Sequence, residues 1–212
     1  MAGDAVAHLG FAHHFVPGKI PRAATLLLLH GTGGNEGDLI PLAGLLDRDA
    51  AVLSPRGKVL EAGMPRWFRR IREGVFDEAD LIARAADLRR FIEEAVTRYE
   101  LDPGRVIAVG FSNGANMAAA LHLLHPTVLR GSVLFRAMVP LEPAITPDLV
   151  GIPVFLAAGR HDPMIAPDNV ERLATLLREA GADVTLSWEP QGHNLVAHEI
   201  DLARQWLASR RI

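Results

Sequence analysis

The pentapeptide Gly-Phe-Ser-Asn-Gly at residues 110–114 limits the possible folds of this chain more than any other segment. It follows the apolar run 106–109 and precedes the helix-like run 115–124. A strand that turns directly into a helix is so sharply bent that side chains two positions before and after the serine would collide with backbone, which explains both glycines. The pattern predicts a nucleophile elbow, with Ser112 exposed in front of free helix N–H groups.

A serine nucleophile needs a histidine and an acid, and after such an elbow they follow in the order Ser, Asp, His. Asp162 comes directly after the apolar run 153–158, and His193 directly after the alternating run 184–188. Each could instead be an ordinary loop residue, with Asp162 capping the turn before a proline. The alternative requires three independent coincidences, so the sequence favours a catalytic triad of Ser112, Asp162 and His193.

A second glycine-rich turn, His-Gly-Thr-Gly-Gly at residues 30–34, follows the buried run 26–29. In hydrolases with a serine elbow, one backbone N–H from this turn and one from the residue after the nucleophile bind the oxyanion. We therefore expect the N–H groups of Thr32 and Asn113 to form an oxyanion hole. For His30, a role in orienting this turn is favoured over that of a second base.

With these segments in place, the chain resembles the phospholipase/carboxylesterase family of α/β-hydrolases over most of its length. It is most similar to the small bacterial carboxylesterases of that family, which include hydrolases associated with hydroquinone resistance. The resemblance implies hydrolysis of carboxylic esters, thioesters or lysophospholipids, and a homodimer. The segments that carry it are 30–36 with Asp38 and Leu39, 54–57, 65–68, 110–114, 136–140, 159–163 and 192–193.

Strand and helix signals alternate along the chain, and the wholly apolar strands are typical of a parallel sheet covered on both faces. This predicts an α/β-hydrolase fold with about seven strands, in one domain over residues 1–212 and without a separate lid. The first strand is expected to start an antiparallel edge hairpin. Expected strands are 11–16, 24–30, 50–55, 105–111, 131–138, 153–158 and 183–189, and expected helices are 36–46, 78–99, 113–125, 167–181 and 195–210.

Composition argues against several classes of function. A formal net charge of −3 and a pI near 6.3 give no general attraction to nucleic acid or anionic membranes. No apolar run approaches the roughly 18 residues of a membrane span, and residues 1–4 lack the basic start of a secretory leader, so we expect a cytoplasmic protein. The chain has no cysteine, which excludes disulfides and a cysteine nucleophile.

Neither a cofactor nor a metal is expected. A dinucleotide fingerprint that begins at Gly31 would need glycine where Glu36 stands, and the chain contains no P-loop lysine motif. The histidines neither form a zinc-binding pattern nor lie near other ligand residues in the sequence. This applies to His13, His14, His122, His125, His193 and His198.

The segment 57–77 is long for a connection, and long loops in compact domains are often functional. It follows a strand at the carboxyl edge of the sheet, where α/β proteins bind ligands. Its aromatic residues either wall the acyl or alcohol pocket or only pin the loop to the core. The candidate substrate-binding residues are Trp67, Phe68, Met64, Phe76 and, after a later strand, Met138.

Five arginines near the expected site need partners. The cluster Arg66, Arg69, Arg70 and Arg72 is expected to form a solvated face paired with nearby carboxylates, rather than to recognise an acidic substrate group. Arg136 interrupts an apolar run, and a buried arginine requires a carboxylate or carbonyl partners. A structural role and substrate anchoring both remain open for Arg136. The carboxylates available to the cluster are Glu61, Glu73, Asp77 and Glu78.

Together these residues predict two-step acyl transfer to water from a small or medium ester. The resemblance leaves a thioesterase or lysophospholipase as the alternative within the enzyme class. A hydrolase-fold protein that binds a ligand with little turnover is the alternative outside that class, because fold alone does not guarantee activity.

Overall fold

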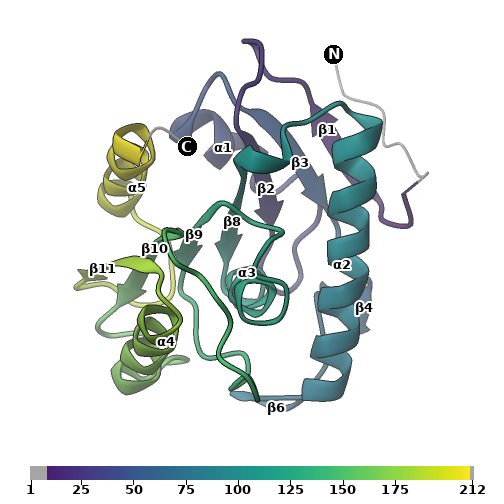
Figure 1. Ribbon diagram of the computed structural model, residues 1–212. Helices are drawn as coiled ribbons and strands as arrows, with labels where there is room; N and C mark the ends of the chain where they lie inside the picture. Colours follow the sequence, from purple (N-terminus) through teal and green to yellow (C-terminus); the bar gives the residue numbers. More distant parts are fainter. Residues whose placement is uncertain (1–8, 211–212) are drawn as a thin grey trace.

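The computed structural model describes residues 9–210, which form a seven-stranded twisted sheet with helices on both faces (Figure 1). The strand order is β1-β3-β2-β8-β9-β10-β11, and every neighbouring pair is parallel except β1 and β3. The mostly parallel sheet predicted from the alternating pattern is therefore present. Residues 1–4, used above to argue against a leader, lie outside the described residues.

The elements follow the predicted order with small shifts at their ends. The sheet contains β1 (His13–Val16), β2 (Thr25–Leu29), β3 (Ala51–Pro55), β8 (Val106–Phe111), β9 (Gly131–Phe135), β10 (Pro153–Gly159) and β11 (Asp183–Glu189). The helices are α1 (Ile40–Leu46), α2 (Glu78–Arg98), the 3₁₀ turn η1 (Pro103–Arg105), α3 (Asn113–Leu124), α4 (Pro167–Glu179) and α5 (Ala197–Arg210). The strand expected over 131–138 ends at Phe135, because Arg136 has a φ of 57° that no strand can continue.

Two hydrophobic clusters lie on opposite faces of the sheet. Leu27 and Leu29 of β2 pack in the cluster covered by α2, α3 and α4, whereas Leu26 and Leu28 pack in the one covered by α1 and α5 (Figure 1). Successive side chains of a strand point to opposite faces, so an unbroken run of leucines fits a strand with helices on both sides.

The prediction that the first strand starts a hairpin is wrong. β1 is antiparallel and lies at the sheet edge, but it pairs with β3, with His13 opposite Pro55, and not with the next strand β2. Contacts with Tyr99, at the end of α2, hold β1 at this edge. The Phe15 ring stacks on it at 4.0 Å between centroids, and 2.7 Å separates His13 Nε2 from its hydroxyl.

The segment 57–77 is folded into two small hairpins rather than an open loop. They consist of β4 (Val59–Glu61) with β5 (Met64–Arg66), and β6 (Arg70–Arg72) with β7 (Val75–Phe76). The segment connects β3 to α2 beside the carboxyl end of the sheet, as expected.

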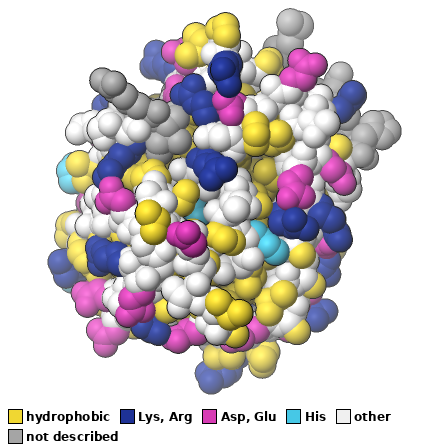
Figure 2. All heavy atoms as spheres, in the orientation of Figure 1, with side chains coloured by type: hydrophobic (Ala, Val, Ile, Leu, Met, Phe, Trp, Pro, Cys, Tyr) yellow, Lys and Arg dark blue, Asp and Glu magenta, His cyan; other side chains and the backbone are white. Residues whose placement is uncertain are grey.

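The surface carries charges of both signs. Figure 2 shows basic and acidic side chains interspersed on the face seen in Figure 1, which agrees with the small net charge of −3. Within residues 9–210, no helix is both long enough and apolar enough to cross a bilayer.

Candidate active site

Ser112 lies between β8 and α3 in a backbone conformation that few residues adopt, with φ 52° and ψ −117°. Its N–H donates to the Phe135 carbonyl of the neighbouring strand at 2.9 Å. A Cβ on Gly114 would lie 1.9 Å from the Leu29 carbonyl oxygen, and one on Gly110 would lie 2.6 Å from Ala115 Cα. The two glycines are therefore sterically required, for the reason the sequence predicts.

The three residues predicted as a triad lie in one hydrogen-bonded row. His193 Nε2 is 2.9 Å from Ser112 Oγ, and His193 Nδ1 is 2.7 Å from Asp162 Oδ2. The Asp162 side chain is buried and its second oxygen accepts the Met164 N–H at 2.8 Å. Because both oxygens are engaged, the carboxylate is held in one orientation against the imidazole.

His30 makes two hydrogen bonds that hold the turn containing Thr32. His30 Nδ1 lies 2.6 Å from the Gly31 carbonyl, and Nε2 accepts the Gly57 N–H at 3.0 Å. A ring that donates at one nitrogen and accepts at the other is neutral. Burial lowers the pKa of His30 and favours this form. These contacts fit a role for His30 in orienting the turn, while Thr32 and Asn113 both line the pocket beside Ser112.

An ion pair supports the same turn from the end of β3. Arg56 donates from Nε and from one terminal nitrogen to the two Glu36 oxygens, each at 2.5 Å. The guanidinium lowers the pKa of Glu36 to about 2. The Glu36 carboxylate is therefore charged at neutral pH, where the ion pair ties the turn to the end of β3.

Trp67 and Phe68 do not line the pocket beside Ser112, so for these two residues the structure favours the second reading, in which they pin the segment to the core. Both are buried in the core, with exposed fractions of 2% and 0%. The Trp67 indole N–H donates to the His30 carbonyl and its backbone N–H to Asn113 Oδ1, both at 2.8 Å. Trp67 thus joins the first hairpin to Asn113 and to the turn that contains Thr32.

Met64 also lies outside the pocket beside Ser112. It is 43% exposed at the start of β5 and lines neither hollow beside Ser112. A Cβ on Gly33 would lie 3.6 Å from its sulfur, so the side chain lies beside the glycine-rich turn.

The pocket beside Ser112 has a volume of about 50 Å³ and is bounded by Phe76 and Met138, two of the predicted substrate-binding residues. A wider hollow of about 280 Å³ adjoins it and shares Thr32, Ser112 and His193. The sequence analysis missed further lining residues, among them Asn116, Met164 and Ile165.

Asn116 carried a signal that could have been recognised. It is a buried amide in a largely apolar helix, where a side chain without a partner would be costly. Its Oδ1 accepts the Met138 N–H at 2.9 Å, so it fixes the residue that bounds the pocket. Met164 and Ile165 follow Asp162 in a loop and carry no comparable signal.

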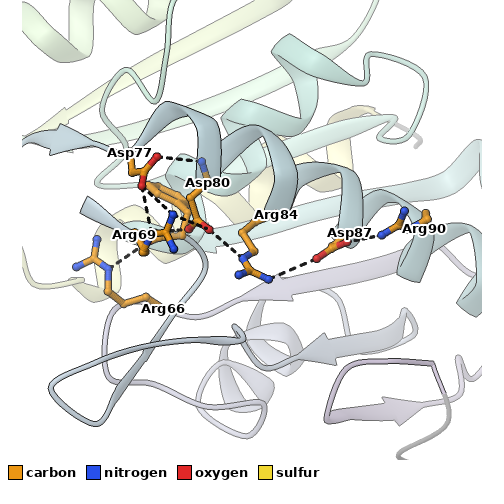
Figure 3. Close-up of polar contacts among 8 residues, drawn as sticks. Arg66, Arg69, Asp77, Asp80, Arg84, Asp87 and Arg90 are labelled. Carbon is orange, nitrogen blue, oxygen red and sulfur yellow. Dashed lines mark hydrogen bonds and ion pairs between the residues drawn. The ribbon is translucent and has the colours of Figure 1, made fainter. Parts of the chain in front are cut away.

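The arginine cluster is only partly the solvated face that was expected. Arg69 pairs with Asp77 and Asp80, and the chain of ion pairs continues along α2 through Arg84 (Figure 3). Arg70 pairs with Glu61 and Glu73.

Arg66 departs from the expectation. It is 3% exposed, pairs with Glu61 at 3.1 Å and donates from Nε to the Phe68 carbonyl. Burial lowers the pKa of Arg66, and these acceptors offset the cost of burying its charge. Arg66 and Arg70 also border the pocket, with their charges already paired.

Across residues 9–210, no three His, Asp or Glu side chains are grouped so as to hold a metal ion.

Comparison with known proteins identifies the family. Residues 13–210 match the sequence profile of the family described as Phospholipase/Carboxylesterase. The chain belongs to the phospholipase/carboxylesterase family. This membership confirms the predicted α/β-hydrolase fold. It also makes hydrolysis the general class of function for this site.

Other members of the phospholipase/carboxylesterase family are similar to this chain in both sequence and structure. It is 50% identical to the Bacillus subtilis (strain 168) protein named as hydrolase MhqD, over 85% of this chain and 90% of that one. A crystal structure of the Bacillus cereus carboxylesterase has a TM-score of 0.91 at 47% identity and covers 92% of each chain. More distantly, acyl-protein thioesterase 1 of Mycosarcoma maydis is 25% identical over 73% of this chain and 75% of that one.

Proposed function

We propose that this family member is a serine carboxylesterase that cleaves small esters through an acyl-enzyme on Ser112. The observation that carries the proposal is the position of the His193 ring, with one nitrogen 2.9 Å from Ser112 Oγ and the other 2.7 Å from Asp162. An imidazole so placed accepts the serine proton while the carboxylate stabilises the positive charge that forms.

In the first half-reaction, Ser112 Oγ attacks the ester carbonyl carbon as its proton passes to His193 Nε2. The carbonyl oxygen becomes an oxyanion, for which we assign the N–H groups of Thr32 and Asn113 as donors. The tetrahedral intermediate collapses, and His193 donates the proton to the departing alcohol. In the second half-reaction, water attacks the acyl-enzyme, loses its proton to His193, and releases the carboxylic acid and Ser112.

The size of the pocket supports short acyl groups. About 50 Å³ between Phe76, Met138 and Ser112 accommodates only a few carbon atoms, whereas the adjoining hollow of about 280 Å³ is open enough for a larger alcohol. We therefore assign the small pocket to the acyl group and the wide hollow to the leaving group.

The test is steady-state hydrolysis of p-nitrophenyl esters from acetate to palmitate by the parent protein and by Ser112→Ala. We expect activity concentrated on the short acyl chains and lost by a factor of about 10⁴ or more in the variant. Activity that survives the substitution would refute Ser112 as the nucleophile.

A thioesterase is the second candidate, favoured by the similarity to acyl-protein thioesterase 1. The same chain-length series as p-nitrophenyl esters and as thioesters distinguishes the two, because a thioesterase would give the higher kcat/KM on thioesters. A protein that only binds its ligand would be acylated once, without steady-state turnover.

A further inference from the structure

Arg136 and Glu199 form an ion pair from which water is completely excluded. Arg136 directly follows β9, and Glu199 lies in the first turn of α5, 63 residues later. The two terminal guanidinium nitrogens donate to the two carboxylate oxygens at 2.6 and 2.8 Å, and both side chains have an exposed fraction of 0%. Neither residue borders the pocket, which argues against substrate anchoring by Arg136.

Two further N–H groups of Arg136 bind the peptide carbonyls that flank His193, and another donates to the Ala157 carbonyl at 3.4 Å. Nε donates to the Gly192 carbonyl at 2.8 Å, and one terminal nitrogen donates to the Asn194 carbonyl at 2.7 Å. Glu199 accepts the Val196 N–H at 2.8 Å. The backbone around the histidine is thus fixed on both sides by one planar group, which only a guanidinium can do.

Close backbone contact with the end of β10 also fixes the loop that contains His193. A Cβ on Gly159 would lie 2.3 Å from the Gly192 carbonyl oxygen, so the loop rests directly on the end of β10. The imidazole of His193 therefore has little freedom beyond rotation about its own side-chain bonds.

The backbone at Arg136 also contacts the nucleophile. The carbonyl of the preceding residue, Phe135, accepts the Ser112 N–H, and the Arg136 N–H donates to the Ala157 carbonyl, both at 2.9 Å. Arg136 holds a left-handed φ of 57°, a strained conformation for a residue with a side chain. One dipeptide therefore holds the serine through its backbone and the histidine loop through its arginine.

A buried ion pair is seldom retained for stability alone, because apolar residues of similar volume often stabilise as well or better. We infer that Arg136, held by Glu199, is a positioning residue that sets the place of His193 relative to Ser112 and Asp162. The inference rests on the proposed serine mechanism. It assigns the pair to the orientation of the general base and not to contact with substrate.

Arg136→Lys is the first test, because lysine keeps the charge but cannot reach both flanking carbonyls and the carboxylate together. We expect kcat on p-nitrophenyl acetate to fall roughly 10- to 100-fold, as a small misplacement of a catalytic group would cause, with KM within about twofold. Arg172→Lys is the matched control, since Arg172 makes an exposed two-point pair with Glu142 and should leave kcat at the parental value.

Glu199→Gln keeps the volume and the acceptor for the Val196 N–H, and it provides the test if the lysine variant does not fold. We expect it to reduce kcat by a smaller factor in the same direction. Every variant is assayed well below its thermal midpoint. A lower midpoint with parental kcat in both variants would overturn the inference and leave the pair purely structural.

A second readout does not depend on turnover. The proton between His193 and Asp162 should give a far-downfield ¹H NMR resonance in the parent, which Arg136→Lys shifts or abolishes in folded protein. An unchanged resonance together with parental kcat would contradict the inference. If the parent showed no Ser112-dependent hydrolysis, the proposed function would fail, while the resonance would still report whether Arg136 positions His193.

Discussion

At the scale of single residues, the site depends on backbone positions that tolerate no change of size. Ser112 has a φ of 52° and ψ of −117°, a conformation that costs of order 1–3 kcal/mol and must be enforced by its surroundings. Because Gly114 has no side chain, the start of α3 can lie directly against the end of β2. This packing holds Ser112 in its unusual conformation. The nucleophile is therefore presented by packing, and not by its own preference.

Substitution of this glycine tests the packing argument. Gly114→Ala would place a Cβ 1.9 Å from the Leu29 oxygen, so we expect a loss of about 2 kcal/mol or more in unfolding free energy and a severe loss of kcat. Gly44→Ala is the matched control, because nothing lies within 4 Å of that Cβ in the middle of α1. It should stabilise by about 0.5–1 kcal/mol. Urea unfolding of both variants decides, and parental stability in Gly114→Ala would contradict the account.

The indole N–H of Trp67 provides a second test at this scale. Trp67→Phe keeps the ring in the core but leaves the His30 carbonyl without its donor, at a cost of about 1–3 kcal/mol. We expect lower stability and kcat, with an unchanged ratio of rates across ester chain lengths. An altered chain-length profile would show that Trp67 contacts substrate after all.

At the scale of elements, the two hairpins within residues 57–77 do most to shape the site. Their strands are two or three residues long and carry no regular alternation, so no periodic signal could predict them. Aromatic residue types indicated that the segment packs against something. They could not distinguish a core position such as Trp67 from a pocket position such as Phe76, because that choice depends on where the hairpins turn.

The pocket beside Ser112, which the second hairpin partly lines, should determine selectivity for the length of the acyl chain. Phe76→Ala and Met138→Ala each enlarge the space beside Ser112, and should raise kcat/KM for octanoate relative to acetate by about 10-fold or more. Ile71→Ala is the control, since Ile71 lies on the same hairpin but is 74% exposed. An unchanged ratio in both pocket variants would remove the acyl group from this pocket.

At the scale of the whole molecule, the sheet and its covering helices could be predicted because wholly apolar strands alternate with helix signals. Ser112, Asp162 and His193 could be placed together because all three follow strands whose carboxyl ends meet at one edge. Glu199 as the partner of Arg136 and the pairing of β1 with β3 could not be predicted. Both depend on contacts between segments far apart in the chain, and nothing local specifies their partners.

The stability of the whole molecule should depend on pH through His122. This histidine of α3 is fully buried 3.0 Å from Ser132 Oγ, and burial lowers its pKa from 6.5 to about 4. The unfolded chain therefore binds the proton first. Stability is complete above pH 6.5 and falls as the pH drops toward 4, by about 2 kcal/mol between pH 7 and pH 5.

Urea unfolding at pH 7 and pH 5 measures this effect, and His122→Gln should reduce the difference between the two. Burial also lowers the pKa of His30 and of His125, so these two histidines contribute to the remaining difference with the same sign. The Glu36 carboxylate, with a pKa of about 2 in the folded protein against 4.5 for the free group, adds only about 0.2 kcal/mol in this interval. The same loss of stability in His122→Gln as in the parent would assign the effect to other groups.

The central claim is the acyl-enzyme on Ser112, and the most direct measurement traps it. The protein is mixed with excess p-nitrophenyl acetate, quenched in acid within milliseconds, digested and mapped by mass spectrometry. The account predicts one acetyl group on the peptide that contains Ser112, formed at the rate of the p-nitrophenol burst and absent from Ser112→Ala. Continued turnover with no acyl group on that peptide would contradict it.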